Sequence, residues 1–194
     1  MTSRIRAATG EDAAAIAAIY APYVTDTVVS FEAEPPDAAE MARRMSALPL
    51  LPWLVAQRDG RVAGYAYASA HRARAAYRWG ADVSVYLDEP ERGRGTGRAL
   101  YARLLDTLRE LGYTGAYGGI TLPNPASVGL HEAMGFTLVG IYRRVGFKLG
   151  HWHDVGWWQL PLVDPPPAHP AEPRPWTRMS CWRQKLTMSQ TIRK

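Results

Sequence analysis

The chain has 194 residues, 47% of them hydrophobic, and carries a formal net charge of +5 at pH 7. This length and composition predict one domain with a sizeable core, and no apolar stretch is long enough to span a membrane. The single cysteine, Cys181, excludes a disulfide framework and a cysteine-based zinc site. Because the first residues lead into a predicted strand without the apolar core of a signal peptide, we expect a cytoplasmic protein.

The positive charge lies mainly near the C-terminus. From Asp164 onward, six lysines and arginines face two acidic residues, so this segment holds four of the five net positive charges. Six prolines between Pro165 and Pro175 make it linker-like. We therefore predict a domain over 1–163 and a Pro-rich, basic tail over 164–194 that is disordered or loosely docked. Because the basicity belongs to the tail, it does not mark the domain as a nucleic-acid binder.

The N-terminal half predicts both helices and strands. Apolar periodicity, caps and turn residues assign, in chain order, a strand at 4–7, a helix from Thr9 to Pro22, an extended segment at 27–32, a helix from Asp37, and strands at 53–57 and 62–70. Asp12 resembles the acidic partner of a capping box, and Pro22 is expected to end the first helix. The Asp-Gly pair at 59–60 predicts a tight hairpin turn.

The C-terminal half adds, in order, a strand at 83–87, a helix ending at Gly112, a strand at 116–122, a helix opened by Asn124 and ended by Gly135, and strands at 138–147 and 155–160. The complete order is β-α-α-β-β-β-α-β-α-β-β. It indicates a mixed α/β sheet, and no internal repeat is visible.

A loop rich in glycine and arginine, 92–98, joins the strand at 83–87 to the following helix. Glycines allow close approach to a ligand, and the N-terminus of a helix favours negative charge, so the loop predicts a site for a phosphate-bearing ligand. The P-loop pattern fails because Gly97 is followed by Arg98 and Ala99. The dinucleotide fingerprint fails because the glycines are spaced G-x-G-x-G. A solvated basic turn is the alternative interpretation.

Arg92, Gly95 and Gly97 resemble the Arg-x-x-Gly-x-Gly signature of the GCN5-related N-acetyltransferases (GNAT). Residues 53–70, 120–136 and 146–160 resemble segments of the phosphinothricin and methionine sulfoximine N-acetyltransferases within that superfamily; together the resemblance spans residues 4 to about 162. It implies the GNAT fold, an α/β fold with a mixed, mostly antiparallel central sheet flanked by helices and strands splayed at the acetyl-CoA site. It also implies a homodimer that uses no metal.

The same resemblance implies a reaction and a set of ligand contacts. The activity would be acetylation of the α-amino group of a small amino-acid analogue by direct attack through a tetrahedral intermediate. The amide of Val85 or of Tyr86 would bond the thioester carbonyl oxygen. Acetyl-CoA would be bound by Val85, Tyr86, Leu87, Arg92, Gly93, Arg94, Gly95, Thr96, Gly97, Arg98, Asn124 and Ser127. For Asn124, a turn residue between two prolines is the alternative role.

Two side chains are candidates for proton transfer. Asp82 opens the central strand at a position where the family typically has a glutamate, regarded as the base; the shorter aspartate favours a bridging water. His131 follows Asn124 on the next helix and could act as acid to the departing thiolate or as base to the amine. The alternatives are a strand-end aspartate bound to backbone and a packed histidine. The sequence does not assign acid and base between the two residues.

An anionic amino acid requires a cationic clamp. Arg72 and Arg74, with Tyr77 nearby, match the substrate loop of the family, and a guanidinium can bind a carboxylate or phosphinate through two hydrogen bonds. Phe31 and Glu32 could wall the pocket and hold the amine. For both groups a solvated surface is the alternative.

His151, His153 and Asp154 suggest a metal site, but further ligands are absent from the local pattern, so no metal is expected. With Trp152, Trp157 and Trp158 they are expected to pack against a partner subunit or near the active site. Three other functions are kept open: acetylation of another amino acid or small amine, a non-catalytic acyl-CoA-binding protein, and a nucleic-acid binder that acts through the tail.

Overall fold

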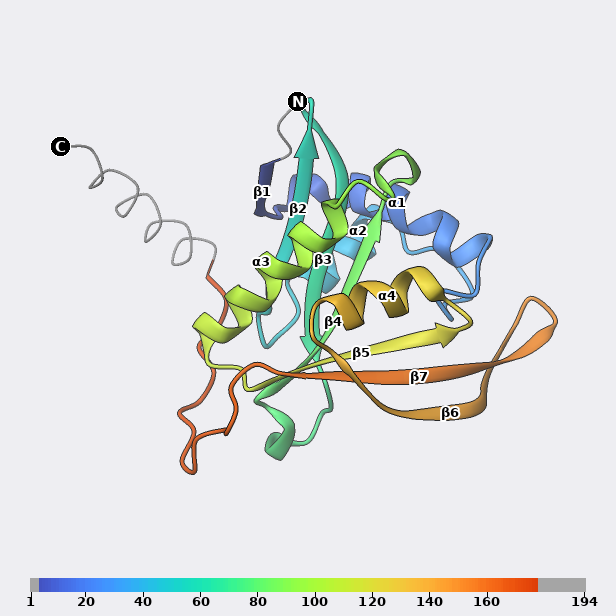
Figure 1. The fold of residues 1–194 in the computed structure, drawn as a ribbon. Helices are drawn as coiled ribbons and strands as arrows, with labels where there is room; N and C mark the ends of the chain where they lie inside the picture. Colours follow the sequence, from blue (N-terminus) through green and yellow to red (C-terminus); the bar gives the residue numbers. More distant parts are fainter. Residues whose placement is uncertain (1–3, 178–194) are drawn as a thin grey trace.

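The computed structural model describes residues 4–177. Within them, seven strands form one sheet, and four α-helices pack against it (Figure 1). In chain order the elements are β1 (Arg4–Ala7), α1 (Ala13–Thr25), α2 (Ala38–Met45), β2 (Trp53–Arg58), β3 (Arg61–Ala70), β4 (Gly80–Leu87), α3 (Thr96–Leu111), β5 (Gly115–Leu122), α4 (Pro125–Ala133), β6 (Thr137–Lys148) and β7 (His151–Pro161). This is the predicted order, and the predicted mixed α/β fold is confirmed.

The strands form a single sheet in the order β1-β2-β3-β4-β5-β7-β6. Every neighbouring pair is antiparallel except β4 and β5. The β2–β3 hairpin turns at Asp59 and Gly60, whose φ angles of 49° and 83° are those that an Asp-Gly hairpin turn requires. Because β7 lies between β5 and β6, β6 forms one edge of the sheet.

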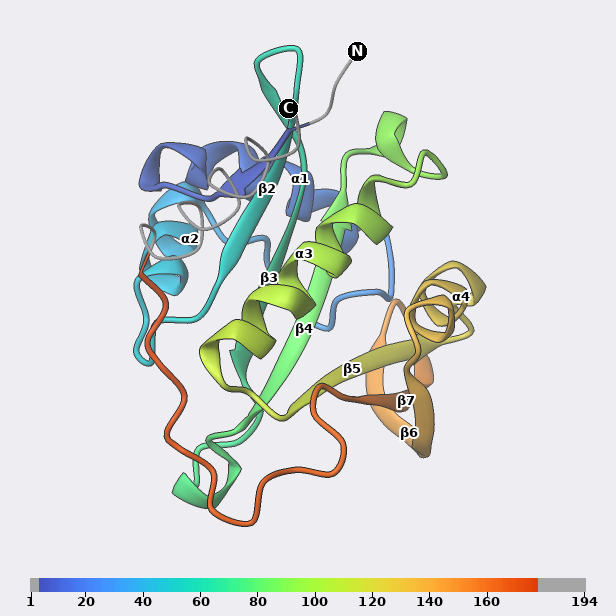
Figure 2. The same ribbon diagram turned by 60° about the vertical axis from the view of Figure 1, so that its left-hand side comes forward.

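Helices cover both faces of strands β2 to β4 (Figure 1, Figure 2). Side chains alternate along β2: Leu54 and Ala56 belong to the apolar cluster built on α3, whereas Trp53 and Val55 belong to the cluster built on α1 and α2. This alternation is expected when successive side chains of a strand point to opposite faces and both faces are buried. The sheet is therefore packed on both faces in this half of the molecule.

The two parallel strands separate soon after they meet. Their register covers only Gly80–Asp82 of β4 and Gly115–Tyr117 of β5. Farther along, β4 continues beside β3 while β5 diverges beside β7 (Figure 1). Within the described part of the chain, residues 83–87 of β4 thus have a strand neighbour on one side only, which is the splayed arrangement that the sequence resemblance implied.

The expected end of the first helix at Pro22 is wrong, because α1 continues to Thr25. Proline cannot donate a backbone hydrogen bond, but its carbonyl can still accept one. The Pro22 carbonyl accepts from the N–H of Asp26 (3.0 Å), and this bond closes the last turn. The predicted capping box is present, since the Asp12 carboxylate accepts from the N–H of Thr9 (2.7 Å), but it caps a 3₁₀ turn at Gly10–Asp12, and α1 itself begins at Ala13.

The segment after β7 was expected to be disordered or loosely docked, but residues 164–177 lie against the domain. Figure 2 shows this segment passing around one end of the sheet. The N–H of Arg174 donates to the Leu111 carbonyl (2.8 Å), and that of Trp176 donates to the Leu50 carbonyl (3.0 Å). The Trp176 side chain is 7% exposed. Proline prevents regular structure here but does not prevent docking. Residues 178–194, with Cys181, lie outside the described residues.

Candidate active site

The divergence of β4 and β5 opens a cleft in the middle of the sheet. Its walls come from β4, β5, the α3 helix and the start of α4. The residues that line it are Val29, Val83, Ser84, Val85, Tyr86, Tyr101, Gly119, Ile120, Thr121, Asn124, Ser127 and His131. Several of the residues predicted from sequence, which are far apart in the chain, therefore meet at one place.

The backbone of β4 offers hydrogen-bonding groups to this cleft. In an antiparallel strand the N–H and C=O of alternate residues point to opposite sides. The N–H of Asp88 donates to the Ala63 carbonyl at the end of β3 (3.1 Å), so that of Tyr86 also points toward β3. The N–H and C=O of Leu87 point to the opposite side, away from β3. There the N–H donates to the Tyr23 hydroxyl (3.3 Å) and the carbonyl accepts from it (2.7 Å). The amide that faces the cleft is therefore that of Val85, not that of Tyr86.

The glycine-rich loop leads from β4 into α3. Gly93 and Gly95 have φ angles of 73° and 82°, a left-handed conformation that other residues rarely adopt, and Gly95 is the N-cap of α3. The side chains of Arg92, Arg94 and Arg98 are exposed. The first N–H groups of a helix lack partners within the helix, so the loop and the helix start can receive an anion.

Beneath this loop lies Glu91, which the sequence analysis missed. Its side chain is almost completely buried, 3.2 Å from the Arg58 guanidinium, and it accepts from the hydroxyl of Thr96 (3.3 Å). These contacts join the start of α3 to the β2 strand. Arg58 comes from β2, far from Glu91 in the sequence, so no local sequence pattern indicates that Glu91 is part of the site.

His131 lies on the far wall of the cleft, where it is 4% exposed. Its Nδ1 is 2.8 Å from the Ser127 carbonyl and its Nε2 is 3.1 Å from the Tyr101 hydroxyl. Burial lowers the pKa of His131, which favours the neutral ring, with Nδ1–H donating to the Ser127 carbonyl. The Tyr101 hydroxyl beside Nε2 also lies 3.2 Å from the Val83 carbonyl, so its one proton is shared between these two acceptors. Tyr101, buried on α3, was missed because nothing in the sequence of that helix distinguishes it from the neighbouring core positions.

Asp82 precedes Val83, the first β4 residue that lines the cleft; it is partly buried and is bound by His71. The His71 Nδ1 lies 2.6 Å from Asp82 Oδ1. Burial raises the pKa of Asp82, and the hydrogen bond to His71 and the charge of Arg72 oppose this effect. His71 was also missed, because the β3–β4 register that brings it beside Asp82 is a property of the folded sheet.

The predicted substrate arginines lie in the loop between β3 and β4. Arg72 places its guanidinium 5.4 Å from the centre of the Trp157 ring and donates to the His71 carbonyl (2.9 Å). Arg74 is exposed, and Tyr77 is 46% exposed with its ring edge toward the His71 imidazole. Arg72 and Tyr77 therefore lie close to His71, the partner of Asp82. Arg72, Arg74 and Tyr77 line a separate hollow beside Leu48 and Pro173, not the cleft between β4 and β5.

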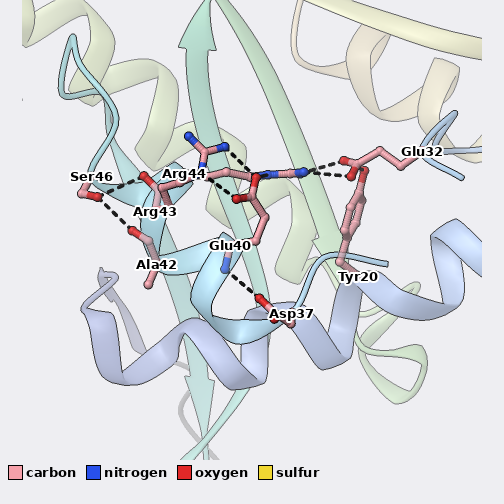
Figure 3. Close-up of polar contacts among 8 residues, drawn as sticks. All are labelled: Tyr20, Glu32, Asp37, Glu40, Ala42, Arg43, Arg44 and Ser46. Carbon is pink, nitrogen blue, oxygen red and sulfur yellow. Dashed lines mark hydrogen bonds and ion pairs between the residues drawn. The ribbon is translucent and has the colours of Figure 1, made fainter. Parts of the chain in front are cut away.

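Glu32 occupies a different environment from the one expected. Both of its carboxylate oxygens accept from the Arg44 guanidinium (2.7 and 2.9 Å), and the Tyr20 hydroxyl donates to it at 2.9 Å (Figure 3). The bonds from Arg44 lower the pKa of Glu32. Its charge is already balanced within the chain, so an amine would compete with Arg44. Phe31 is 42% exposed.

The remaining candidates have structural partners. The Asn124 side chain accepts from the N–H of Ser127 (3.1 Å) and caps α4. The Asp154 carboxylate accepts from Arg143 (2.7 Å), and His153 Nε2 lies 3.0 Å from the Lys148 carbonyl. Among residues 4–177, no group of three or more His, Cys, Asp or Glu side chains is arranged to hold a metal ion.

The three tryptophans differ in their surroundings. Trp158 is 3% exposed in the core of the domain, which leaves it no surface for a subunit interface, and it pairs with Gly118, the neighbour of His131. Trp157 lies beside His71, and Trp152 is exposed. No helix in the described part of the chain is long and apolar enough to cross a membrane.

Comparison with known proteins identifies relatives of both kinds implied by the sequence. The family described as "Acetyltransferase (GNAT) domain" matches residues 5–157. A phosphinothricin N-acetyltransferase of Streptomyces viridochromogenes is 41% identical over 170 residues, 87% of this chain and 93% of the relative. An L-methionine sulfoximine/L-methionine sulfone acetyltransferase of Salmonella typhimurium is 36% identical, covering 81% of this chain and 94% of the relative.

A solved structure agrees with these relatives in fold. The phosphinothricin acetyltransferase of Sinorhizobium meliloti, determined in complex with AcCoA, superposes with a TM-score of 0.84 at 39% identity. The superposition covers 89% of this chain and 95% of that one. The likeness therefore includes nearly the whole described domain.

Proposed function

The chain belongs to the GNAT acetyltransferase family and is an acetyl-CoA-dependent N-acetyltransferase, and from this premise we propose that its substrate is a small anionic amino acid of the phosphinothricin or methionine sulfoximine type. The observation that carries the proposal is the surroundings of Asp82. Its partly buried carboxylate is bound by His71, and the charge of Arg72, the next residue along the chain, acts on it, so a base for the amine and a cation for the acid group of one small substrate lie in one region. An ordinary amino acid or another small amine is the alternative acceptor.

The residues of the cleft suit acetyl-CoA. The free side of β4 can pair with the extended, amide-containing pantetheine arm, and the amides of the loop 92–95 and of the start of α3 can receive the pyrophosphate. Acetyl-CoA, when bound, supplies a thioester carbonyl that an amine can attack. We assign to the N–H of Val85 the hydrogen bond that stabilises the negative charge on the carbonyl oxygen.

Proton transfer divides between the two walls of the cleft. An α-amino group is largely protonated at neutral pH and must lose its proton before attack. We assign this proton to Asp82, through one water, because its pKa is raised by burial and a raised pKa makes a carboxylate a better base. Tyr101 and His131, on the opposite wall, are assigned as a pair: the Tyr101 hydroxyl gives its proton to the departing thiolate, and the neutral His131 ring, hydrogen-bonded to that hydroxyl, holds it in place.

The anionic end of the substrate is assigned to Arg72 and Arg74, with Tyr77 as a neighbouring wall. A guanidinium binds a carboxylate or phosphinate with two parallel hydrogen bonds. Phe31 is assigned a wall of the same pocket. Glu32 is assigned to the wall of the pocket and not to binding the amine, because Arg44 already binds its carboxylate.

We also propose that the enzyme is a homodimer that pairs through β6 and β7. More than half of the large exposed hydrophobic side chains in the described residues lie on these strands or the turn between them: Leu138, Val139, Tyr142, Val145, Phe147, Leu149 and Trp152. An apolar surface of this kind marks an interaction site. The use of acetyl-CoA agrees with the cytoplasmic location that the sequence suggested.

Free-thiol release from acetyl-CoA tests the proposed reaction. We expect turnover with phosphinothricin, methionine sulfoximine or methionine sulfone, and slower turnover with ordinary amino acids. Asp82→Asn keeps the side-chain shape but removes the base, so kcat should fall by about 10²- to 10⁴-fold while the Kd for acetyl-CoA is unchanged. Undiminished turnover in the variant would remove the base role from Asp82. Acetyl-CoA binding without turnover on any amine would favour a non-catalytic protein.

A further inference from the structure

One contact at the site is not part of the assigned chemistry. His71 Nδ1 and Asp82 Oδ1 are only 2.6 Å apart, a distance typical of a strong hydrogen bond that involves a charged group. The two side chains are mostly buried, with 15% and 27% of their surfaces exposed. Within residues 4–177, Asp82 Oδ1 has this one partner and Oδ2 has none. The carboxylate is therefore fixed at one oxygen and available at the other.

The imidazole that makes this contact is itself held in place by aromatic rings. The Tyr117 ring stacks on it at 4.2 Å between centroids with an interplanar angle of 18°. The rings of Tyr77 and Trp157 approach it edge-on, each at 6.0 Å. These rings come from three different segments, so His71 has one preferred orientation. A donor fixed in this way can fix its acceptor.

We propose that His71 is the positioning residue for the proton-accepting carboxylate, and that its Nδ1–H holds Asp82 so that Oδ2 faces the substrate amine or its bridging water. This inference rests on the proposed role of Asp82 as the base. Aspartate is one methylene shorter than the glutamate typical of the family, so its carboxylate has less reach and its exact placement matters more. A second side chain that fixes the carboxylate meets this need.

The contact also has an electrostatic consequence. A hydrogen bond donated to a carboxylate favours its charged form, and burial disfavours it. At Asp82 burial is the larger effect, and His71 works against it. The other charged or titratable groups around this pair are Arg72, Tyr67, Tyr77 and Tyr117. Without the donor, burial would be less opposed, so Asp82 would hold its proton up to a higher pH.

Two substitutions separate hydrogen bonding from packing. His71→Asn keeps an N–H donor at the position of Nδ1 but lacks the ring. His71→Phe keeps a ring that can stack on Tyr117 but lacks the donor. The readout is kcat and KM between pH 5.5 and 9, with acetyl-CoA and phosphinothricin, or with the best acceptor of the amine panel. Melting temperatures of both variants report the loss of packing.

For His71→Phe we expect kcat to fall by about 10- to 100-fold, the range for losing a hydrogen bond to a charged group. The acid side of its pH–rate profile should move to higher pH, and the KM for acetyl-CoA should not change. His71→Asn should lie closer to the wild type in both rate and profile, even if it melts at a lower temperature. If His71→Phe does not fold, His71→Leu takes its place.

A purely structural role predicts different results. In that case both variants lose activity in proportion to their loss of stability, and the acid side of the profile stays where it is. That outcome overturns the inference, as does a wild-type profile in His71→Phe. Asp82→Asn distinguishes a failure of the base assignment from a failure of the positioning role. If Asp82→Asn is inactive while His71→Phe behaves like the wild type, only the positioning role of His71 fails. If Asp82→Asn remains active, the base assignment fails and the inference fails with it.

Discussion

The buried carboxylates of this chain differ in the partner that each one meets. Asp12 is bound at both oxygens by the Arg6 guanidinium, with two distances of 2.7 Å, and Glu91 lies 3.2 Å from Arg58. An arginine keeps its charge at all ordinary pH values, so these two pairs serve the fold, and the bonds from Arg6 lower the pKa of Asp12. Asp82 is bound by a histidine instead, and burial raises its pKa, the opposite of the shift at Asp12. This difference leaves Asp82 as the carboxylate that can exchange a proton during turnover.

The pair of Asp12 and Arg6 gives a prediction about stability. Burial works to raise the pKa of Asp12, but hydrogen bonds from Arg6 and the N–H of Thr9 lower it below its ordinary value. The stabilisation is complete above the unfolded pKa, about 3.9, and is lost as the pH falls below it. Asp12→Asn should therefore lower the free energy of unfolding by about 1–3 kcal/mol at pH 7.

Urea denaturation at pH 7 and at pH 3 measures this effect. The difference between wild type and variant should shrink at the lower pH, because the wild type then loses the same charge. An equal difference at both values would contradict the linkage. Asp106→Asn is the matched control, since the Asp106 carboxylate is half-exposed in its pair with Arg109 and its loss should change stability by less than about 1 kcal/mol.

At the scale of elements, the β5 strand and the α4 helix touch at a glycine. A Cβ at Gly118 would lie 2.5 Å from His131 Nε2 and 2.8 Å from its Cδ2, closer than packed atoms approach. The absence of a side chain on β5 therefore allows the imidazole to reach Tyr101. Gly118→Ala should displace the His131 ring and lower kcat by about tenfold or more, the cost of misplacing a proton-transfer group.

Gly129→Ala is the control on the same helix. A Cβ at Gly129 would meet nothing within 4 Å, and alanine favours a helix over glycine by about 0.5–1 kcal/mol. We expect this variant to be slightly more stable and fully active in the thiol-release assay. A drop in kcat for Gly118→Ala that only parallels a drop in the folded fraction would speak against the displacement.

The elements were predictable from sequence because their signals are local. Asp12 and Asp37 cap helices, the Asp-Gly pair turns a hairpin, and Gly112 ends α3, each through contacts within a few residues. Pro22 misled because it lies within the last turns of α1, and its carbonyl still accepts the bond from Asp26 that closes the helix at Thr25. Local signals therefore give the order of the elements but not all of their ends.

The site was predictable only in part, for the opposite reason. Asp82 and His131 follow from the resemblance, because each occupies a position that the family uses. His71 and Tyr101 are set by the β3–β4 register and by the packing of α3 against α4. The residue spacing within a single segment does not indicate the register of two strands or the packing of two helices. The partners that orient the candidate catalytic groups therefore emerge only with the fold.

At the scale of the whole molecule, the sheet has two unlike halves. Strands β2 to β4 are covered by helices on both faces, whereas β6 and β7 extend beyond α3 and expose apolar side chains (Figure 1). The segment 164–177, which follows β7, makes long-range backbone hydrogen bonds to Leu50 and Leu111. Composition predicted the irregular backbone of that segment and left disorder and loose docking open, because docking depends on where Trp176 finds an apolar surface.

The exposed half predicts assembly. Phe147 and Trp152 face each other across the β6–β7 hairpin at 5.3 Å between ring centroids, and each is 61% exposed. If this surface pairs two subunits, a charge at its centre must lose its water on association. Trp152→Glu should then weaken the dimer by a factor of roughly 30 or more, because aromatic side chains at the centre of an interface dominate its binding energy.

Sedimentation velocity over a range of protein concentrations measures this change. Leu48→Glu provides the control, because Leu48 is 85% exposed but lies between α2 and β2, away from the hairpin. The control should sediment as the wild type does, whereas Trp152→Glu should shift toward the monomer. A wild type that remains monomeric at every concentration would refute the dimer. A Trp152→Glu variant that stays dimeric would instead place the interface elsewhere on the molecule.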